Sequence, residues 1–319
     1  MRRLTLDDVT SARDVLGPHL PATPLRPCQA LEGRTWLKLE CWQPTGSFKV
    51  RGALNALSAM STAERAAGLV TASAGNHGLG VAFAAQTLGL EDEVSVFVPR
   101  TAPQAKLRRL RRFPVTVVEH GETYEEASAA AHEHARHRGS RFVHAYEDPV
   151  IAAGQGTIAL ELLEQLPELT RVFVPVGGGG LIAGLATAFA ALRPTVRVVA
   201  VQPAASPALR ASLERGIALT EYPAGPTLAD GVAGGIGEIA FEHRDLIHDV
   251  VVVEEEQLEN AMLALLEHDQ VVAEGSGALG VAALMADSGG QKHTGASVVV
   301  VTGGNVDLAV IRRLLTTRG

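Results

Sequence analysis

Short runs rich in β-branched residues alternate along the chain with alanine-rich stretches whose apolar residues recur at helical spacing. The short runs predict strands at residues 68–72, 94–98, 115–118, 142–145, 171–176, 197–201, 250–253 and 297–302. Helical patterns lie between them at residues 79–88, 123–137, 156–166, 181–192, 255–267 and 277–285. This alternation is typical of parallel sheets with helices on both faces. The sequence therefore predicts an α/β fold, without any repeat of fixed period.

The composition fits a globular protein of about two domains. The chain has 319 residues, of which 46% are hydrophobic, enough for a core that buries about three-quarters of the unfolded surface. Its formal net charge of −7 argues against nucleic-acid and membrane-surface partners, which favour a basic face. One basic helix is expected to be a solvated face; it carries Lys106, Arg108, Arg109, Arg111 and Arg112.

The location expected from the sequence is a reducing cytoplasm. No apolar run reaches membrane-spanning length, and the N-terminal residues lack the apolar block of a secretory signal. Cys28 and Cys41 match neither a metal-ligand spacing nor a CxxC motif.

One lysine follows a short flexible turn, in the order Pro44, Thr45, Gly46, Ser47, Phe48, Lys49. An ammonium group held against apolar surface has a lowered pKa, and the neutral amine forms a Schiff base with an aldehyde. Lys49 is therefore the candidate for covalent chemistry. The alternative is a lysine that forms a salt bridge at the start of the helix expected at residues 50–60.

A second segment joins a strand to a helix through small residues, from Ser73 through Ala74, Gly75 and Asn76 to His77. Small residues let a ligand approach the main chain, and amides at a helix N-terminus bind carboxylate or phosphate. We therefore expect an anion at this loop. The alternative is an ordinary N-terminal turn in which Ser73 or Asn76 caps free amides.

A third segment runs from a strand into four glycines and an apolar helix, with Gly177, Gly178, Gly179 and Gly180 in succession. The run makes sense where several amides converge on a phosphate that a Cβ would keep away. No Gly-Lys-Ser/Thr follows, so the segment is not a P-loop. A GxGxxA dinucleotide pattern fits, but the next strand ends at Gln202 where a ribose-binding acid is wanted, so a nicotinamide enzyme is only an alternative.

A fourth segment places Thr302 at a strand end before Gly303 and Gly304, where its hydroxyl can meet a heteroaromatic nitrogen. Together the lysine, the anion loop, the phosphate loop and the neutral hydroxyl resemble the fold type II pyridoxal 5'-phosphate enzymes. That group includes threonine and serine dehydratases and serine racemase. Residues 151–161 and 229–232 extend the resemblance over nearly the whole chain.

The resemblance implies two lobes, similar to tryptophan synthase β, each with a parallel-rich sheet flanked by helices. Residues 1–47 and 146–319 would form a large cofactor-binding domain, and residues 48–145 a small domain that carries the substrate loop. It also implies a homodimer that acts on a small amino acid.

The resemblance implies a role for each matching residue. Lys49 would bind the aldehyde of pyridoxal 5'-phosphate and move the substrate Cα proton. Phe48 would pack near the cofactor ring, Asn76 would bond the ring hydroxyl, and Thr302 would meet the ring nitrogen. The phosphate is expected at Gly177, Gly178, Gly179 and Gly180. The substrate carboxylate is expected at Ser73, Ala74, Gly75, Asn76 and His77.

The implied reaction is elimination of a β-hydroxyl, which converts L-threonine or L-serine to a 2-oxo acid and ammonia. A neutral hydroxyl cannot keep the ring nitrogen protonated, so the β-leaving group departs and transamination is suppressed. Racemisation, or dehydration of another substrate such as threo-3-hydroxyaspartate, is an alternative. A nicotinamide-dependent oxidoreductase and a binding protein without catalysis are alternatives from other classes.

Several positions depart from the relatives. Ala74 stands where serine racemase has a second serine that delivers a proton to the opposite face, so racemisation should be weak. Gln202 and Ala208 stand where metal-activated members have acidic residues, so no divalent-ion dependence is expected. Thr302 replaces a more usual serine.

Two residues keep two interpretations. Tyr146 stands where the racemase-like members have an asparagine, and it either narrows the substrate pocket or belongs to the core or rim. Glu274 matches a family glutamate close to the site, and the alternative is a capping or ion-pairing carboxylate.

Overall fold

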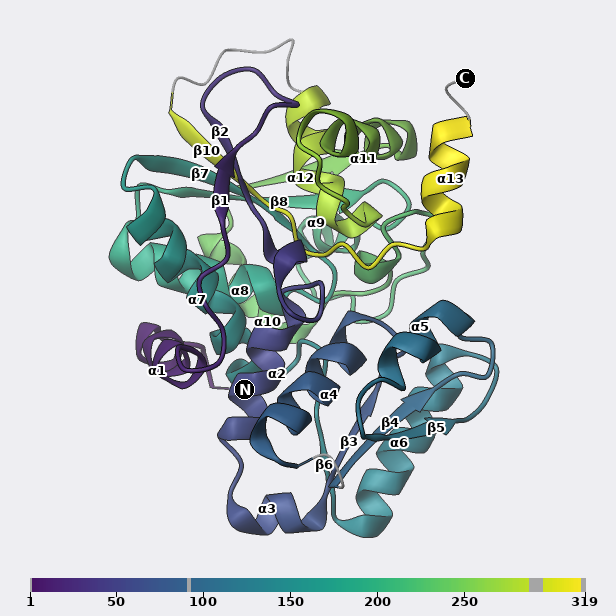
Figure 1. The fold of residues 1–319 in the computed structure, drawn as a ribbon. Coiled ribbons are helices and arrows are strands. Elements are labelled where there is room, and N and C mark those ends of the chain that lie inside the picture. Colours follow the sequence, from purple (N-terminus) through teal and green to yellow (C-terminus); the bar gives the residue numbers. More distant parts are fainter. Residues whose placement is uncertain (1, 91–92, 287–294, 317–319) are drawn as a thin grey trace.

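The computed structural model describes residues 2–90, 93–286 and 295–316 (Figure 1). The strands are β1 (Leu25–Pro27), β2 (Thr35–Lys38), β3 (Leu69–Ala72), β4 (Val94–Val98), β5 (Thr116–Glu119), β6 (Arg141–Phe142), β7 (Leu169–Pro175), β8 (Arg197–Pro203), β9 (Asp249–Val253) and β10 (Ala296–Val300). The α-helices are α1 (Leu6–Leu16), α2 (Lys49–Ser58), α3 (Thr62–Ala67), α4 (Asn76–Leu88), α5 (Gln104–Leu110), α6 (Tyr124–Arg138), α7 (Pro149–Gln165), α8 (Gly180–Leu192), α9 (Ala208–Arg215), α10 (Glu238–Glu242), α11 (Glu255–His268), α12 (Gly275–Ala286) and α13 (Leu308–Thr316). Short 3-10 helices are η1 (Glu40–Trp42), η3 (Asp230–Val232) and η4 (Arg244–Leu246).

A six-stranded sheet has the order β1-β2-β10-β7-β8-β9, in which only the β1–β2 pair is antiparallel. Its central strand β10 is buried at every position, as expected for a parallel strand covered on both faces. Buried side chains of α7 and α8 pack in one core cluster, and those of α11 and α12 in another, each with alternate residues of the strands. The two clusters lie on opposite faces of the sheet, because neighbouring strand residues point to opposite sides.

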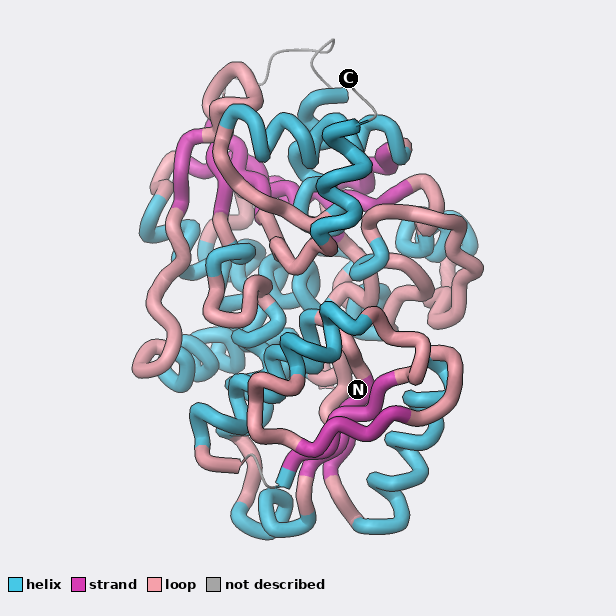
Figure 2. Tube along the Cα trace, turned by 45° about the vertical axis from the view of Figure 1, so that its right-hand side comes forward, coloured by secondary structure: helices cyan, strands magenta, loops and turns pink. Residues whose placement is uncertain are grey.

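A four-stranded sheet has the order β5-β4-β3-β6 and is parallel throughout. Buried residues of α2, α4 and α5 pack on one side, whereas Ala131 and Ala135 of α6 pack against Val70, Ala72 and Phe97 on the other. Figure 2 shows the strands in two separate groups with helices and loops between them. None of the helices in the described ranges is both long and apolar enough to cross a membrane.

The predicted strands and helices occur in the structure, with shifted ends. The strand expected at residues 142–145 is the two-residue β6, and the last strand ends at Val300 instead of Thr302. Helix α7 begins at Pro149, seven residues earlier than the expected start at residue 156, since Asp148 caps it by accepting a hydrogen bond from the Val150 N–H.

The N-terminal elements were missing from the prediction. Strand β2 is only four residues long and does not alternate, and it enters the sheet by pairing with β10, far away in the sequence. Helix α1 has a local signal in its capping box of Thr5 and Asp8. The prediction of an α/β fold with parallel-rich sheets is otherwise confirmed.

Candidate active site

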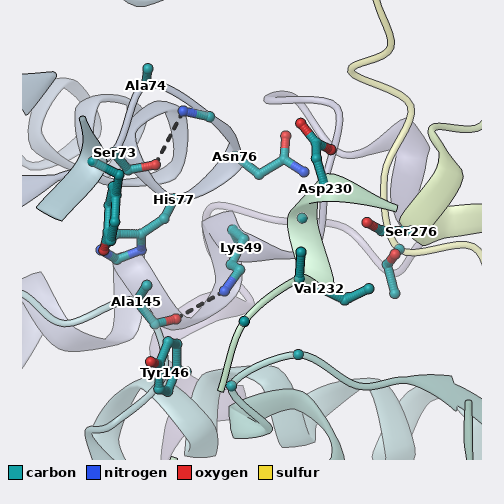
Figure 3. Close-up of a pocket in the computed structure, with 18 of the residues that line it drawn as sticks. Lys49, Ser73, Ala74, Asn76, His77, Ala145, Tyr146, Asp230, Val232 and Ser276 are labelled. Atoms are coloured by element: carbon teal, nitrogen blue, oxygen red, sulfur yellow. Dashed lines mark hydrogen bonds between the residues drawn. The ribbon is translucent and has the colours of Figure 1, made fainter. Parts of the chain in front are cut away.

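A cavity of about 1250 Å³ lies at the carboxyl ends of strands from both sheets, where parallel α/β folds form their binding sites. Helix α4 follows β3, α8 follows β7, and the segment after β10 completes the wall. Every residue assigned to the site from the sequence lines this cavity: Phe48, Lys49, Ser73, Ala74, Gly75, Asn76, His77, Gly177, Gly178, Gly179, Gly180 and Thr302. Figure 3 shows Lys49 between Ser73 and Ala74 on one side and Val232 and Ser276 on the other.

Lys49 is the first residue of α2, and the turn before it is held by the segment after β10. The Phe48 N–H donates to the Thr302 carbonyl at 3.0 Å, and the Gly304 N–H donates to the Gly46 carbonyl at 2.9 Å. Helix α4 also packs on the start of α2, where a Cβ added to Gly80 would lie 3.1 Å from the Lys49 carbonyl oxygen. The backbone of Lys49 is therefore held from two sides, by the segment after β10 and by helix α4.

The Lys49 amine is held in surroundings that favour its neutral form. Its Nζ donates to the Ala145 carbonyl at 3.0 Å and lies 5.3 Å from the centre of the Phe48 ring. Burial lowers the pKa of Lys49 to about 8, and the charge of Glu274 opposes that change only in part. No carboxylate is paired directly with it among the ion pairs of the described residues, which disfavours the salt-bridge interpretation.

This pKa predicts the pH dependence of covalent capture of an aldehyde by the protein without cofactor. Only the neutral amine reacts, so the rate constant should rise with pH to a midpoint near 8, whereas an ordinary lysine has a pKa of 10.5. The measurement is the absorbance change on mixing with pyridoxal 5'-phosphate between pH 6.5 and 10. Glu274→Gln removes the charge that raises the Lys49 pKa, and should move the midpoint to lower pH. A midpoint near 10 in the unmodified chain would contradict the assignment.

The loop of residues 73–77 ends in the N-terminus of the 13-residue helix α4. Ser73 Oγ accepts a hydrogen bond at 3.1 Å from the N–H of Gly75, the residue just before α4, but no side chain of the described residues caps the amides of the helix itself. No recorded bond among the described residues uses the N–H of Asn76, His77 or Gly78 as donor. Burial lowers the pKa of His77 to about 3, so this histidine is neutral and an anion here would be held by amides.

The four glycines lead into the 13-residue helix α8, which begins at Gly180, and the first turn of this helix offers further amides. No recorded bond of the described chain uses the N–H of Gly178, Gly179 or Gly180 as donor. The sequence-based reason for the glycines was incomplete, since protein atoms also exclude a Cβ. A Cβ on Gly178 would clash with the Tyr146 ring, and a Cβ on Gly180 would lie 3.0 Å from the Tyr146 carbonyl oxygen. A Cβ on Gly179 would clash with Ala240, and Gly179 also has a φ of 88°, which favours glycine.

Two hydroxyl groups line the cavity near the end of β10. Thr302 is 3% exposed, as expected for a residue just beyond a buried strand. Ser276, in the first turn of α12, is also 3% exposed, and its Oγ has no hydrogen-bond partner among the described residues. The sequence analysis did not find Ser276. The sequence signal that could have found Ser276 was its position two residues after Glu274, at the start of a helix next to a candidate site residue.

Glu274 and Tyr146, whose roles the sequence left open, both lie in the cavity wall. Glu274 Oε1 accepts a hydrogen bond from Asn76 Nδ2 at 2.7 Å. Burial raises the pKa of Glu274 to about 7, and the charge of Asp230 adds to the rise. The Tyr146 ring lies under Gly178 and meets the His144 ring edge-on, with the ring centres 4.6 Å apart.

The basic helix differs from its expected role as a solvated face. Lys106 and Arg109 of α5 line the cavity, whereas Arg108, Arg111 and Arg112 are exposed. The signal was the spacing of three residues between Lys106 and Arg109, which puts them on one side of the helix.

Gln202, where a metal ligand was considered, is fully engaged in protein contacts. Its Nε2 donates to the Val176 carbonyl at 3.2 Å, and its Oε1 accepts from the N–H groups of Leu209 and Arg210 at 3.0 and 3.2 Å. Across the described ranges, no three His, Cys, Asp or Glu side chains are arranged to hold a metal ion. Independence from divalent ions stays a prediction.

Comparison with known proteins agrees with this geometry. The family described as pyridoxal-phosphate dependent enzyme matches residues 16–303. The chain is 42% identical to the L-threonine ammonia-lyase of Thermotoga maritima, over 98% of this chain and 78% of that protein. Among solved structures, the threonine deaminase from T.th. has a TM-score of 0.87 at 36% identity, covering 95% of this chain and 99% of that one. Maize serine racemase has a TM-score of 0.92 at 31% identity, covering 99% and 98%. The predicted resemblance to fold type II enzymes is confirmed, and the chain belongs to the family of pyridoxal-phosphate dependent enzymes.

Proposed function

We propose that this chain is an ammonia-lyase that uses pyridoxal 5'-phosphate to convert L-threonine, L-serine or both to a 2-oxo acid and ammonia. The observation that carries the proposal is one cavity lined by a half-buried lysine and by the free amides of two helix N-termini, α4 and α8. Such a cavity offers one covalent site and two anion sites, which match an aldehyde, a phosphate and an amino-acid carboxylate. The relative that is 42% identical, named L-threonine ammonia-lyase, supports the reaction class.

The residues of the cavity fit the cofactor. The amides of Gly178, Gly179 and Gly180 are free at the N-terminus of a long helix, where a phosphate is stabilised by hydrogen bonds and by the helix dipole. The buried Ser276 hydroxyl has no hydrogen-bond partner in the part of the chain that the structure describes, and a buried polar group of this kind calls for a ligand. When bound, the cofactor supplies an electron sink for the charge left at Cα by proton removal.

Lys49 carries the covalent and proton-transfer steps. Its neutral amine would hold the cofactor by its aldehyde, and the same Nζ would serve as the base for the substrate Cα proton. A pKa of about 8 leaves a useful fraction of the amine neutral near neutral pH. Its hydrogen bond to the Ala145 carbonyl holds Nζ inside the cavity.

The other residues orient the reactants. The loop of residues 73–77, with the free amides of Asn76 and His77, would bind the substrate carboxylate, and Phe48 would pack near the cofactor ring. Thr302 lines the cavity and would present a neutral hydroxyl to the ring nitrogen. A hydroxyl would not keep that nitrogen protonated, which would favour loss of the β-hydroxyl over transamination.

The proposal is tested by incubating the purified, cofactor-loaded protein with L-threonine, L-serine and threo-3-hydroxyaspartate in separate reactions. Release of the 2-oxo acid is followed with and without a chelator. We expect release from threonine or serine that the chelator leaves unchanged, because Gln202 offers no hard anionic oxygen to a divalent ion. No release from any of the three would refute the proposal, and release lost on chelation would refute the metal-free site.

We also propose a cytoplasmic homodimer, in which residues 1–47 and 146–319 form the cofactor-binding domain and residues 48–145 the small domain. The two separate sheets support the division into two domains. Sedimentation of the cofactor-loaded protein tests the dimer, and a monomer over the working concentration range would exclude it.

Serine racemisation is a second candidate, favoured by the TM-score of 0.92 to maize serine racemase. Racemisation needs a proton donor on the face opposite Lys49, and Ala74 in the cavity wall cannot supply one. We expect Ala74→Ser to raise the rate of D-serine formation from L-serine at least about tenfold, within the range of one added acid–base group. Chiral chromatography measures the product. The matched control is Ala233→Ser at an exposed position of the wall, and an equal rise there would contradict the role of position 74.

A further inference from the structure

Helix α5 reaches across the cavity to segments that belong to the other sheet. It connects β4 to β5 in the four-stranded sheet, and its Lys106 and Arg109 lie on one side. Lys106 Nζ contacts Asp230 Oδ2 at 2.9 Å, and Arg109 donates from one guanidinium nitrogen to Asn305 Oδ1 at 2.7 Å. Asn305 lies in the segment after β10, which runs towards α13 (Figure 1).

The contact with Arg109 is the first of three hydrogen bonds in series. Asn305 Nδ2 donates to Asn76 Oδ1 at 2.7 Å and to the Thr45 carbonyl at 2.8 Å. Asn76 Nδ2 in turn donates to Glu274 Oε1 at 2.7 Å. The series therefore leads from α5, through Asn305, to the residue that begins α4 and to a buried carboxylate.

The ends of this series fix the direction of every amide within it. A guanidinium group only donates, so the oxygen of Asn305 faces Arg109 and its nitrogen faces Asn76. The Asn76 oxygen is thereby turned towards Asn305, and its nitrogen towards Glu274, which accepts. Asn76 Nδ2 has a second hydrogen with no recorded acceptor in the described chain, and Asn76 lines the cavity. Asn76 thus has a donor hydrogen left for a bound molecule.

We propose that Arg109 is a positioning residue that acts through Asn305 to hold the Asn76 amide with its nitrogen towards the cofactor ring oxygen. The inference rests on the proposed function for the role of Asn76. Because Arg109 belongs to α5, the amide is fixed only while α5 lies against the segment after β10. The same contact therefore couples the placement of the four-stranded sheet over the cavity to the cofactor site.

The neighbouring contact provides a natural comparison. Lys106 and Asp230 also join α5 to the opposite side, but their side chains are 38% and 65% exposed, and no recorded hydrogen bond of the described residues links either side chain to Asn305 or Asn76. An exposed pair contributes little to stability. If holding α5 in place were the whole role of these contacts, loss of either one would change the same properties of the site, and neither would act selectively on the Asn76 amide.

The experiment compares Arg109→Met, Arg109→Lys, Lys106→Met and the control Arg108→Met, which changes the exposed neighbour on the same helix. The readouts are the dissociation constant of pyridoxal 5'-phosphate, the visible spectrum of the bound cofactor, and kcat and KM for L-threonine. We expect Arg109→Met to weaken cofactor binding about tenfold, to shift the spectrum and to lower kcat more than it raises KM, since one charge-assisted bond orients the series. Arg109→Lys should recover part of each change, and Arg108→Met should alter none.

Comparing the cofactor affinity of single and double variants shows whether Arg109 and Asn305 act in one series of hydrogen bonds or independently. Asn305→Ala interrupts the series, so adding Arg109→Met to it should cause no further loss of cofactor affinity. Additive losses, equal effects of Lys106→Met and Arg109→Met, or an unchanged cofactor spectrum would each overturn the proposal. Cofactor affinity and spectrum are measured without substrate, so these outcomes are distinct from a failure of the threonine assay.

Discussion

Replacing Lys49 by alanine is expected to lower 2-oxo acid release from L-threonine by at least about 10³-fold, because both the covalent attachment and the Cα proton transfer lose their group. The visible spectrum should change as well, since the cofactor aldehyde is no longer bound to an amine. Reduction with borohydride followed by peptide mass mapping gives a direct check. The sequence has four lysines, and only the peptide with Lys49 should carry the cofactor in the unchanged protein.

Two further variants distinguish the chemistry of Lys49 from its charge. Lys49→Arg keeps a cation but no neutral amine at accessible pH, so it should be as inactive as the alanine variant. Added methylamine should restore part of the turnover of Lys49→Ala, because the cavity of about 1250 Å³ leaves room for a small amine in place of the side chain. Turnover of Lys49→Ala above a tenth of the original rate would contradict the assignment.

The sequence predicted those parts of the site whose signals are local. The four glycines and the loop of residues 73–77 each join a strand to a helix, and such junctions lie at the carboxyl ends of parallel strands by construction of the fold. Thr302 is found in the same way, just after a fully buried strand. These segments meet in one cavity because their strands are parallel, and the periodicity of the sequence already indicates parallel sheets.

Contacts between distant residues left no such signal. Arg109 and Asn305 are 196 positions apart. The spacing of Lys106 and Arg109 puts both on one side of α5, but the sequence does not indicate that this side faces the cavity. The entry of β2 between β1 and β10 likewise depends on pairing across more than two hundred residues. The steric need for glycine at residues 178 and 179 depends on Tyr146 and Ala240, which only the fold brings near.

The second large effect is expected at Arg51, two residues after Lys49 in α2. Its guanidinium group donates to both oxygens of Glu40 at 2.8 Å and to Glu161 at 2.6 and 3.0 Å. Lys38 Nζ contacts Glu161 and the Thr23 carbonyl, the latter at 2.8 Å. Arg51 and Glu40 are 1% and 0% exposed, so a neutral cluster of two cations and two carboxylates is buried between α2, α7 and the end of β2.

We expect Arg51→Leu to lower the free energy of unfolding by about 3–5 kcal/mol, since it leaves buried carboxylates without their main partner. For a protein of this size the midpoint of thermal unfolding should fall by roughly 10 °C. The control is Arg34→Leu, which removes a contact of 3.0 Å to Glu168 between side chains that are 54% and 47% exposed. That variant should cost about 1 kcal/mol or less. If both variants lost the same free energy of unfolding, the Arg51 cluster would contribute no more than an exposed ion pair, and the assignment would be wrong.

The pH dependence of the loss provides a separate test of the mechanism. In the unchanged protein burial alone would raise the pKa of Glu40, but Arg51 holds it below the ordinary value of 4.5. Its contribution to stability is therefore complete above that value and is lost as the pH falls. Without Arg51 the same burial raises the pKa, so Glu40 takes up a proton on folding and the variant suffers most at high pH. The difference in thermal midpoint between Arg51→Leu and the unchanged protein should thus be larger at pH 8 than at pH 5. A constant difference would mean that lost packing of the arginine stem, and not the unpaired carboxylate, causes the destabilisation.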